Sequence, residues 1–140
     1  MEIRELIYNK IHDSGQRMTR NKELLIDVLL SNRDYFLSVN GILEKLSHDS
    51  MDTATVYRII QSLHAIGVVE TTVVSGGITK YKVCDPGPHH HMICTRCGKV
   101  LNFPCDESPW ESYLKENKFT EESHKLEIYG ICEECRKIPD

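Results

Sequence analysis

Two Cys-x2-Cys pairs constrain the fold of this chain more than any other feature. Cys94 and Cys97 form the first pair, Cys132 and Cys135 form the second, and the 34 residues 98–131 separate them. Each pair presents two sulfur atoms about a tetrahedral edge apart, as a four-thiolate structural zinc site requires. Two redox-active motifs are the alternative, but two copies without a thioredoxin-like βαβ frame are unusual. We therefore expect a structural Zn²⁺ that closes a small subdomain.

The composition is that of an ordinary globular protein. At 140 residues the chain is long enough for one domain or two small ones. It shows neither an apolar run of membrane-spanning length nor a signal-peptide core, so we expect no membrane partner. Six cysteines without a secretion signal indicate the reducing cytoplasm, where thiolates bind metal instead of forming disulfides.

The net charge of −4 is unevenly distributed along the chain. Residues 1–83 carry 10 basic and 10 acidic side chains, and residues 84–140 carry 7 and 11, which together give the totals of 17 and 21. Four zinc-bound thiolates would make the second half more negative still. Any contact with nucleic acid is therefore expected from the first half.

Residues 1–83 show the element order of a winged helix-turn-helix. Two β-branched runs, residues 68–74 and 78–83, are joined across a Ser-Gly-Gly segment and predict a hairpin. The helices come before this hairpin, as they do in a winged helix. Apolar stripes at helical spacing predict these helices over residues 2–13, after the N-cap Thr19, after the N-cap Ser38 and over residues 52–66, ended by Gly67.

The second half is predicted to be a small α/β domain, so that the whole fold class is α+β. Pro86-Gly87-Pro88 breaks the pattern and predicts a hinge over residues 84–90. Strands at residues 91–95 and 99–103 flank the first cysteine pair. A helix over residues 107–117 and a last strand with Leu126, Ile128 and Ile131 lead to the second pair. The apolar side chains expected to face inward from that helix are Trp110, Tyr113 and Leu114.

Three motifs resemble those of the ferric uptake regulator family, and they occur in the family's order. They are Asp52-Thr-Ala-Thr-Val-Tyr-Arg-Ile-Ile-Gln-Ser-Leu63, His89-His-His-Met-Ile-Cys-Thr-Arg-Cys-Gly-Lys-Val-Leu-Asn-Phe103 and His124-Lys-Leu-Glu-Ile-Tyr-Gly-Ile-Cys-Glu-Glu-Cys135. The likeness runs nearly end to end, from Gly15 onward. It implies a homodimeric, metal-dependent transcriptional repressor. Residues 1–83 would be its winged-helix DNA-binding domain and residues 91–140 its dimerisation and metal-binding domain.

The resemblance implies that the helix over residues 52–66 enters the major groove of a double-stranded, inverted-repeat operator. Arg58 can contact guanine O6 and N7 or a phosphate, and Tyr57 can pack on thymine methyl groups, beside Thr55. The alternative for these side chains is an ordinary solvated helix face. The basic residues expected to contact phosphates are Arg17, Arg20, Lys80 and Lys82.

The regulatory metal site of the iron- and peroxide-sensing relatives is not reproduced in this chain. Those relatives use a histidine, an acidic residue closing the wing, two histidines in an H-x-H motif and an acidic residue on the following strand. The corresponding residues here are Phe36, Lys82, His89, His91 and Asn102, so only the two histidines remain. An iron or peroxide sensor is therefore disfavoured.

The zinc uptake regulators of the family use a different set, which reads Glu70, Cys84, His89 and His91 in this chain. One carboxylate, one thiolate and two imidazoles suit four-coordinate Zn²⁺, and a thiolate disfavours a hard cation such as Mn²⁺. The alternative is that Cys84 is a small buried side chain and Glu70 a solvated charge. The resemblance thus predicts zinc as the signal, with iron-, manganese- or peroxide-responsive regulation as the alternative.

The family also implies a third metal site, formed by His90, His124 and a carboxylate from the helix between them. Glu107 and Glu111 are the two candidates for that carboxylate. The alternative for His124 is that it caps a strand. Cys105 lies outside every proposed set and is assigned no role.

Two other classes of function compete with a regulator. The sequence shows no Ser-His-Asp arrangement, no phosphate-binding glycine loop and no His-Glu-x-x-His motif, so we expect no enzyme and no small-molecule substrate beyond metal ions. The predicted regulatory site also has four protein ligands, whereas a catalytic zinc keeps one position open for water. A zinc-stabilised structural adaptor remains the second alternative, but it would need neither a recognition helix nor a wing.

Overall fold

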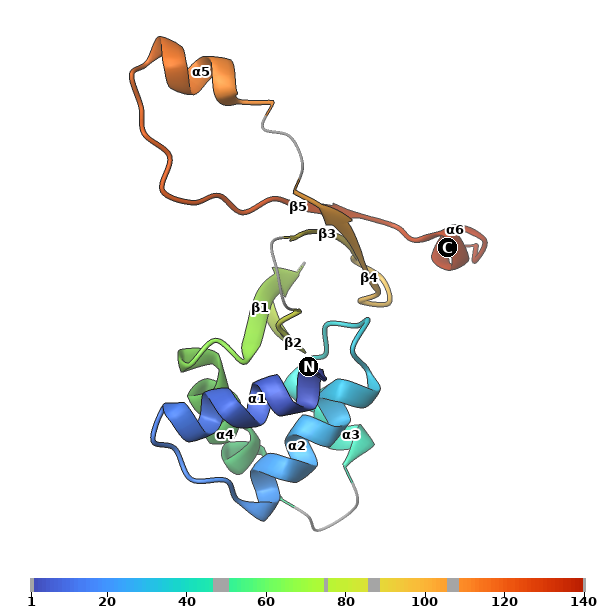
Figure 1. Ribbon diagram of the computed structural model, residues 1–140. Coiled ribbons are helices and arrows are strands. Elements are labelled where there is room, and N and C mark those ends of the chain that lie inside the picture. The colour runs from blue at the N-terminus through green and yellow to red at the C-terminus, as the bar shows by residue number, and fades with distance from the viewer. Residues whose placement is uncertain (1, 47–50, 75, 86–88, 106–108, 140) are drawn as a thin grey trace. The chain divides into compact units, whose positions relative to one another are not determined.

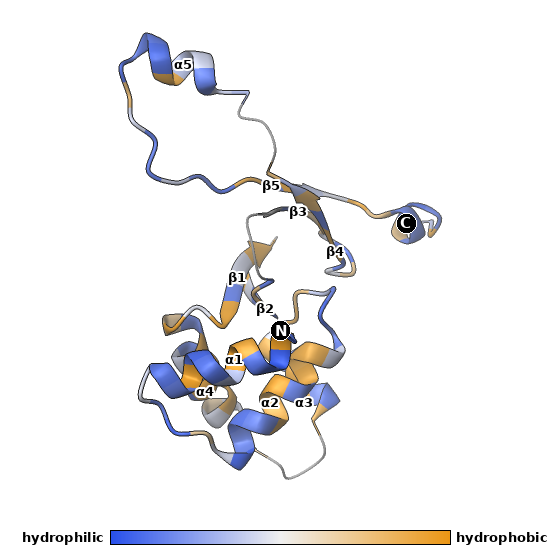
Figure 2. Ribbon diagram, in the orientation of Figure 1, coloured by the Kyte–Doolittle hydropathy of each residue, from blue (hydrophilic) through white to orange (hydrophobic). Residues whose placement is uncertain are grey.

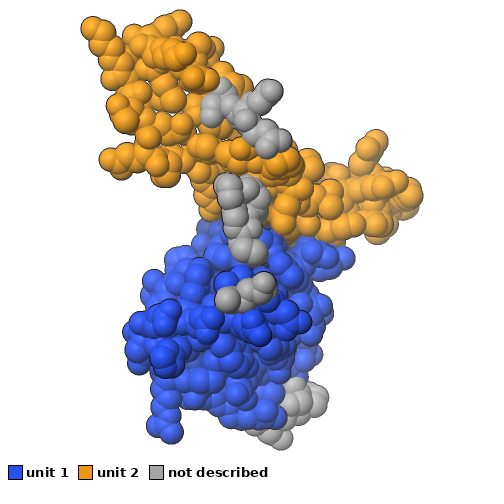
Figure 3. Space-filling model, in the orientation of Figure 1, with its two compact units in different colours: residues 1–86 blue, residues 87–140 orange. Residues whose placement is uncertain are grey.

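The computed structural model describes residues 2–46, 51–74, 76–85, 89–105 and 109–139 of the chain. It contains two compact units, residues 1–86 and 87–140, which Figure 3 shows in different colours. The predicted domain of residues 1–83 lies within the first unit, and that of residues 91–140 lies within the second. In the part of the chain that is described, no helix has the length and apolar character needed to cross a membrane.

The first unit consists of helices followed by a two-stranded sheet, as Figure 1 shows. This order confirms the predicted winged helix-turn-helix. Its elements are α1 (Ile3–Asp13), α2 (Arg20–Ser31), α3 (Val39–Lys45), α4 (Thr53–Ala65), β1 (Val69–Val74) and β2 (Ile78–Val83).

Local hydrogen bonds explain where three of these helices begin. Thr19, Ser38 and Asp52 each accept a hydrogen bond from the backbone amide three residues later, at 3.2, 3.0 and 2.8 Å respectively. Each side chain satisfies an amide that has no partner within its own helix. Gly67 follows α4 with a φ of 79°, a left-handed conformation that only glycine adopts without steric cost. The predicted caps and the predicted stop are therefore confirmed.

The apolar faces of the four helices and of the sheet enclose a single core. In Figure 2 the helices of this unit carry orange and blue segments in alternation, as amphipathic helices do. On α4 the inward side chains leave the opposite face of the helix free for other contacts. The buried core residues are Ile7, Ile11, Leu25, Ile26, Leu29, Val39, Ile42, Val56, Ile60, Leu63, Val68, Val69, Tyr81 and Val83.

The antiparallel hairpin β1–β2 forms the wing. Gly76 and Gly77, in its turn, have φ angles of 88° and 75°, which glycine tolerates because it has no Cβ. Leu37 and Tyr81 exchange two backbone hydrogen bonds of 2.8 Å. The segment before α3 is therefore attached to the edge of β2, and the wing is fixed to the helices.

The second unit is built on a three-stranded sheet in the order β4-β3-β5, with β3 antiparallel to β4 and parallel to β5. Because parallel neighbours need a crossover, the chain leaves the sheet after β4 and returns to β5 through a long excursion that carries α5. The elements of this unit are β3 (His89–Cys94), β4 (Val100–Pro104), α5 (Glu111–Glu116), β5 (Glu127–Gly130) and α6 (Glu133–Arg136).

The excursion between β4 and β5 differs from the sequence-based expectation. The helix is shorter than the predicted residues 107–117 and contains no buried residue. Tyr113 was expected to face inward, but 66% of its surface is exposed. This expectation was wrong for Tyr113, whereas Trp110 and Leu114 are half-buried and the Trp110 ring lies 4.9 Å from that of His124. The last strand is shorter than predicted, since Leu126 and Ile131 lie just outside β5, and Ile128 and Ile131 expose 48% and 44% of their surface.

Candidate metal centres and nucleic-acid interface

The two cysteine pairs meet at one end of the sheet in the second unit. The sulfur atoms of Cys94, Cys97, Cys132 and Cys135 all lie within 4.8 Å of one another. Those of Cys97 and Cys132 are 3.7 Å apart, close to the edge of about 3.8 Å that a Zn–S distance of about 2.3 Å implies for a tetrahedron. All four cysteines are free thiols, so the cluster fits a metal ion and not a pair of disulfides.

Backbone amides point at the sulfur of Cys94, which lies at the end of β3. The amide groups of Cys97 and Cys132 donate to it at 3.5 and 3.4 Å. Burial of Cys94 opposes its ionisation, but these amides lower the pKa of the thiol to about 6. A sulfur that is ionised near neutral pH is ready to bind a cation. The donor set therefore fits a structural Zn²⁺.

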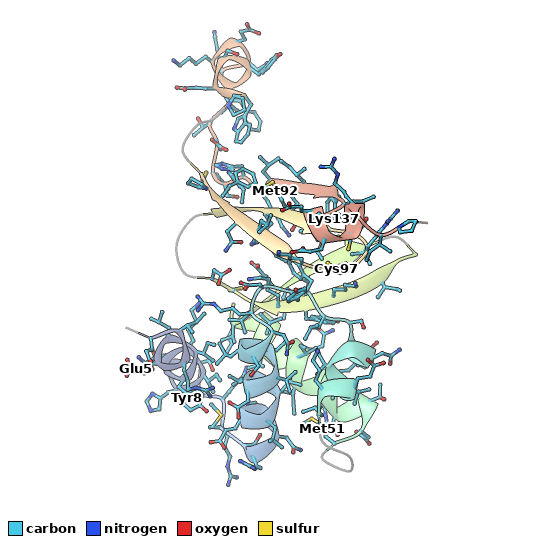
Figure 4. The ribbon with its side chains drawn as sticks, turned by 90° about the vertical axis from the view of Figure 1, so that its right-hand side faces the viewer. Glu5, Tyr8, Met51, Met92, Cys97 and Lys137 are labelled. Carbon is cyan, nitrogen blue, oxygen red and sulfur yellow. The ribbon has the colours of Figure 1, made fainter. Side chains whose placement is uncertain are left out.

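Polar contacts hold the two halves of this cysteine cluster together. Arg96, in the turn after β3, donates to the backbone oxygen of Cys135 in α6 at 3.3 Å. Lys99 and Glu134 form an ion pair of 3.4 Å. Cys97 lies in the same turn and is labelled in Figure 4. These contacts join the turn that carries the first cysteine pair to the helix that carries the second.

The outward face of α4 carries the side chains that were predicted to read DNA bases. Tyr57 exposes 47% of its surface, and Arg58 is also exposed. Arg58 donates to the hydroxyl group of Thr55 at 3.2 Å, and Thr55 in turn donates its backbone amide to Asp52. Hydrogen bonds from Thr55 lower the pKa of Asp52, which keeps this carboxyl ionised. The arginine is thus held on α4 by a short local chain of contacts.

The basic side chains predicted to contact phosphates differ in their position and exposure. Arg17, on the segment between α1 and α2, and Arg20, the first residue of α2, are both exposed. Gln16 donates to the backbone oxygen of Ser62 at 3.0 Å, so this segment lies against α4. Arg20 is 3.8 Å from Glu23, an exposed pair that costs little to break. Both arginines are therefore exposed, and the segment before them contacts α4.

Lys82 cannot contact a phosphate from its place in the structure. Its side chain is 1% exposed, and its ammonium group lies 2.7 Å from Asp85 and 3.8 Å from Glu70. Register explains the second contact, because Glu70 and Lys82 are directly opposite each other on β1 and β2. Lys80 is only half-buried on β2, so its predicted phosphate contact remains open.

The four predicted regulatory ligands are divided between the two units. Glu70 lies on β1 and Cys84 follows β2, both in the first unit, whereas His89 and His91 lie on β3 in the second. Burial, together with the negative charge of Glu70, raises the pKa of the Cys84 thiol to about 11. The backbone amide of Cys84 donates to the oxygen of Val68 at 2.9 Å, so Cys84 lies beside the strand that carries Glu70, two positions from it. The grouping of all four residues stays a prediction.

The structure changes the predicted third metal site. His90 and His124 come together, but the third side chain beside them that could bind a metal is Cys105, to which the sequence analysis assigns no role. Glu111 instead pairs with Lys115 at 3.6 Å on the exposed side of α5. Glu107 lies outside the described residues. Sequence reasoning missed Cys105 because it is 19 positions from His124, and only the crossover topology brings them together.

Comparisons with known proteins agree with this architecture. A model of the ferric uptake regulator family matches residues 13–129. The zinc uptake regulation protein of Mycobacterium tuberculosis is 32% identical over 127 residues, which cover 88% of this chain and 97% of that protein. The ferric uptake regulation protein of Bacillus subtilis is 31% identical over 136 residues, which cover 92% and 91%. The structure of the Vibrio cholerae ferric uptake regulator matches with a TM-score of 0.71 and 25% identity, covering 87% of this chain and 96% of that one.

Proposed function

Because this chain belongs to the ferric uptake regulator family, whose members are metal-responsive transcriptional regulators and not enzymes, we propose that it is a zinc-responsive repressor. It acts in the cytoplasm as a homodimer and binds an inverted-repeat DNA operator. A structural Zn²⁺ occupies the four-cysteine cluster. A regulatory Zn²⁺ binds Glu70, Cys84, His89 and His91 and switches operator binding on.

The observation that carries the choice of zinc is the donor chemistry at the base of the wing. Cys84 supplies a sulfur at the end of β2, and its backbone amide donates to the oxygen of Val68 at 2.9 Å, two positions before Glu70 on the neighbouring strand. Lys82 stands where iron-sensing relatives have an acidic ligand, and it is buried against Asp85 at 2.7 Å. A sulfur donor suits Zn²⁺ better than a hard cation, and a buried ammonium group cannot bind a metal.

The exposed face of α4 supports DNA as the partner. Tyr57 and Arg58 leave the helix on the side opposite the buried residues Val56, Ile60 and Leu63. A helix in the major groove reads bases through such side chains, and the exposed arginines before α2 can position it through phosphates. Replacing a base-reading side chain should therefore affect DNA binding differently from replacing a phosphate-contacting one.

An apolar face on the sheet of the second unit supports a homodimer. Met92 on β3 is opposite Leu101 on β4 and Ile128 on β5, and these side chains expose 39%, 48% and 48% of their surface. With Ile131 they line an open cavity of about 310 Å³. Contiguous exposed apolar side chains of this kind mark association surfaces, and a second copy of the chain offers the same surface in return.

The proposed switch follows from the division of the regulatory ligands between the units. A two-fold operator demands one separation of the two winged helices, set by half-sites about one helical turn or a multiple of it apart. A Zn²⁺ that joins the wing of the first unit to β3 of the second selects that separation. By thermodynamic linkage, operator DNA must tighten zinc binding by the same factor by which zinc tightens DNA binding.

Replacing Cys84 with alanine is expected to abolish zinc-stimulated operator binding while the fold, the structural zinc and the dimer remain. The reason is that Cys84 contributes the only sulfur to the proposed regulatory set. Zinc is titrated into the variant while operator binding is followed by fluorescence anisotropy. His91→Ala should also abolish zinc-stimulated operator binding. Glu70→Ala should reduce this stimulation less, because water can replace a carboxylate ligand.

A matched control for the histidine variant is His12→Ala, because His12 is exposed at the end of α1 and belongs to no metal cluster in the described residues. It should retain full zinc stimulation. Normal zinc activation of Cys84→Ala would remove this residue from the sensor. Activation of the unaltered protein by Fe²⁺ or Mn²⁺ but not by Zn²⁺ would overturn the choice of metal, and metal-independent DNA binding would favour a structural adaptor.

Arg58→Ala is expected to weaken operator binding by about 1–3 kcal/mol and to reduce discrimination against altered base pairs. Arg20→Ala should instead weaken binding to operator and random DNA equally and lower the salt slope by about one. Salt-dependent anisotropy titrations with operator and random duplexes separate the two effects. Unchanged affinity of Arg58→Ala for both duplexes would show that α4 is not the reading element.

A further inference from the structure

One amide side chain joins the segment between α1 and α2 to both α2 and α4. Gln16 donates from Nε2 to the backbone oxygen of Ser62, in α4, at 3.0 Å. Its Oε1 accepts a hydrogen bond of 3.1 Å from the ammonium group of Lys22, in the first turn of α2. Because an amide carries a donor and an acceptor at its end, Gln16 can connect an ammonium group with a carbonyl group.

Lys22 also holds the main chain of Arg17. Its ammonium group donates to the backbone oxygen of Arg17 at 2.8 Å, and its own backbone amide donates to the hydroxyl group of Thr19 at 3.2 Å. Lys22 is half-buried, whereas Arg17 is exposed. The three side-chain hydrogen bonds, two from Lys22 and one from Gln16, form a connection between α2 and α4 that we call the Gln16–Lys22 bridge.

The charges along the Gln16–Lys22 bridge favour this arrangement. Ser62 is one of the last four residues of α4, and the carbonyl groups at the end of a helix carry a partial negative charge. Lys22 places a full positive charge at the other end of the Gln16 amide. Hydrogen bonds from a charged donor are stronger than neutral ones, and hydrogen bonds in a chain polarise one another. The bridge is therefore expected to persist although it lies at the surface.

We propose that Gln16 and Lys22 are positioning residues for DNA binding, an inference that rests on the DNA partner proposed above. They hold the main chain of Arg17 against α4, so that this exposed arginine contacts a phosphate while α4 lies in the major groove. Packing does not restrict the segment at Gly15, because no described heavy atom beyond its chain neighbours lies within 4 Å of the place of a Cβ. Hydrogen bonds that hold the arginine before DNA arrives lower the entropy cost of binding.

A direct contact of Lys22 with a phosphate is the competing role for this side chain. Its ammonium group already donates to two acceptors within the protein, and both lie on the segment that carries Arg17. A lysine that contacts DNA directly would contribute to binding whether or not Arg17 is present. A lysine that acts by positioning Arg17 contributes only when the arginine side chain is there. The two roles therefore differ in their coupling to Arg17.

The test is a double-mutant cycle on the full chain with excess zinc, with a fluorescently labelled duplex of random sequence as the probe. Gln16→Met keeps the length of the side chain but removes its hydrogen bonds, and it is expected to weaken duplex binding about three- to tenfold. Arg17→Ala should weaken binding at least as much. In the Arg17→Ala background, Gln16→Met should have no further effect, because the bridge acts only through Arg17. A role in folding alone would give the same loss in both backgrounds.

Lys22→Met should show the same coupling to Arg17, and Lys22→Arg should retain normal binding because a guanidinium group has donors for both acceptors. Lys10→Met is the matched control. Lys10, on α1, also donates from its ammonium group to a backbone oxygen, that of Gly67 at 3.2 Å, but it makes no contact with the segment that carries Arg17. Any effect of Lys10→Met on duplex binding should be the same with and without Arg17.

Additive losses from Gln16→Met and Arg17→Ala would overturn the proposal, and so would unchanged duplex binding of Gln16→Met. If Lys22→Met lowered the salt slope by about one in the Arg17→Ala background, Lys22 would be a phosphate contact and not a positioning residue. Binding to random DNA does not depend on the operator sequence. Failure of the protein to bind any duplex in any metal state would overturn the proposed function as well, whereas additive losses in a DNA-binding protein overturn only this inference.

Discussion

Replacing Cys97 with serine is expected to remove the structural Zn²⁺ and to leave the second unit largely unfolded. Thiolate zinc sites contribute on the order of 10 kcal/mol or more to folding, which is comparable to the entire stability of a small domain. Among the described residues of this unit, the buried apolar side chains are Ile93, Cys94, Val100 and Cys135. Two of these four are themselves proposed zinc ligands, so we expect that the remaining core cannot replace the metal.

The variant should contain less than one zinc per chain by elemental analysis and sediment as a monomer. Limited proteolysis should remove residues 87–140 and leave the first unit, whose core does not depend on metal. Tyr113→Ala is a suitable control because Tyr113 belongs to the same unit, exposes 66% of its surface and lies outside the cluster. A dimeric Cys97→Ser protein that still binds operator would rule out a structural role for this zinc.

Lys82→Met is expected to destabilise the first unit by about 3 kcal/mol. The substitution keeps the volume of the side chain but removes the ammonium group that lies between Asp85 and Glu70, whose side chains are 12% and 23% exposed. Asp85 keeps a second partner, Arg33, at 3.1 Å. Glu70 is then left next to another carboxylate with its main cation removed. Urea unfolding followed by far-UV circular dichroism measures the loss, since most helices belong to the first unit.

A double-mutant cycle separates the ion pair from simple packing. Glu70→Gln in the Lys82→Met background should recover a large part of the lost stability, because it removes the negative charge that the Lys82 ammonium group no longer offsets. Lys80→Met, on the half-buried neighbouring lysine, should change stability by no more than about 0.5 kcal/mol. Equal losses for Lys82→Met and Lys80→Met would show that the buried ion pair contributes nothing.

The helices of the first unit could be predicted from the sequence because their signals are local. Thr19, Ser38 and Asp52 each cap a helix through an amide three residues away, and Gly67 ends α4 through its own φ angle. The four-cysteine cluster was also predictable, since the spacing within each pair already matches the metal geometry. None of these inferences requires knowing how distant segments pack.

The candidate site was harder to predict wherever it depends on pairing between strands. Lys82 read as a surface cation on the wing until the register placed it opposite Glu70 and the fold buried it. If the strand register had been derived from the predicted turn of the hairpin, it would have placed Lys82 opposite Glu70. Cys105 meets His124 only because β3 and β5 are parallel neighbours, and no sequence spacing predicts that pairing. For α5, apolar spacing indicated burial, but no residue of the helix is buried and Tyr113 exposes 66% of its surface.

The parallel pairing of β3 with β5 also determines the order in which the protein can be completed during synthesis. The first unit needs only residues that precede the second, so it can fold as soon as they leave the ribosome. The sheet of the second unit has to wait for residues 127–130, and its metal cluster waits for Cys132 and Cys135. A nascent chain therefore completes α4, the proposed DNA-reading helix, before its four-cysteine cluster can form. If α4 reads DNA as proposed, metal control of that binding is added only when the last strand enters the sheet.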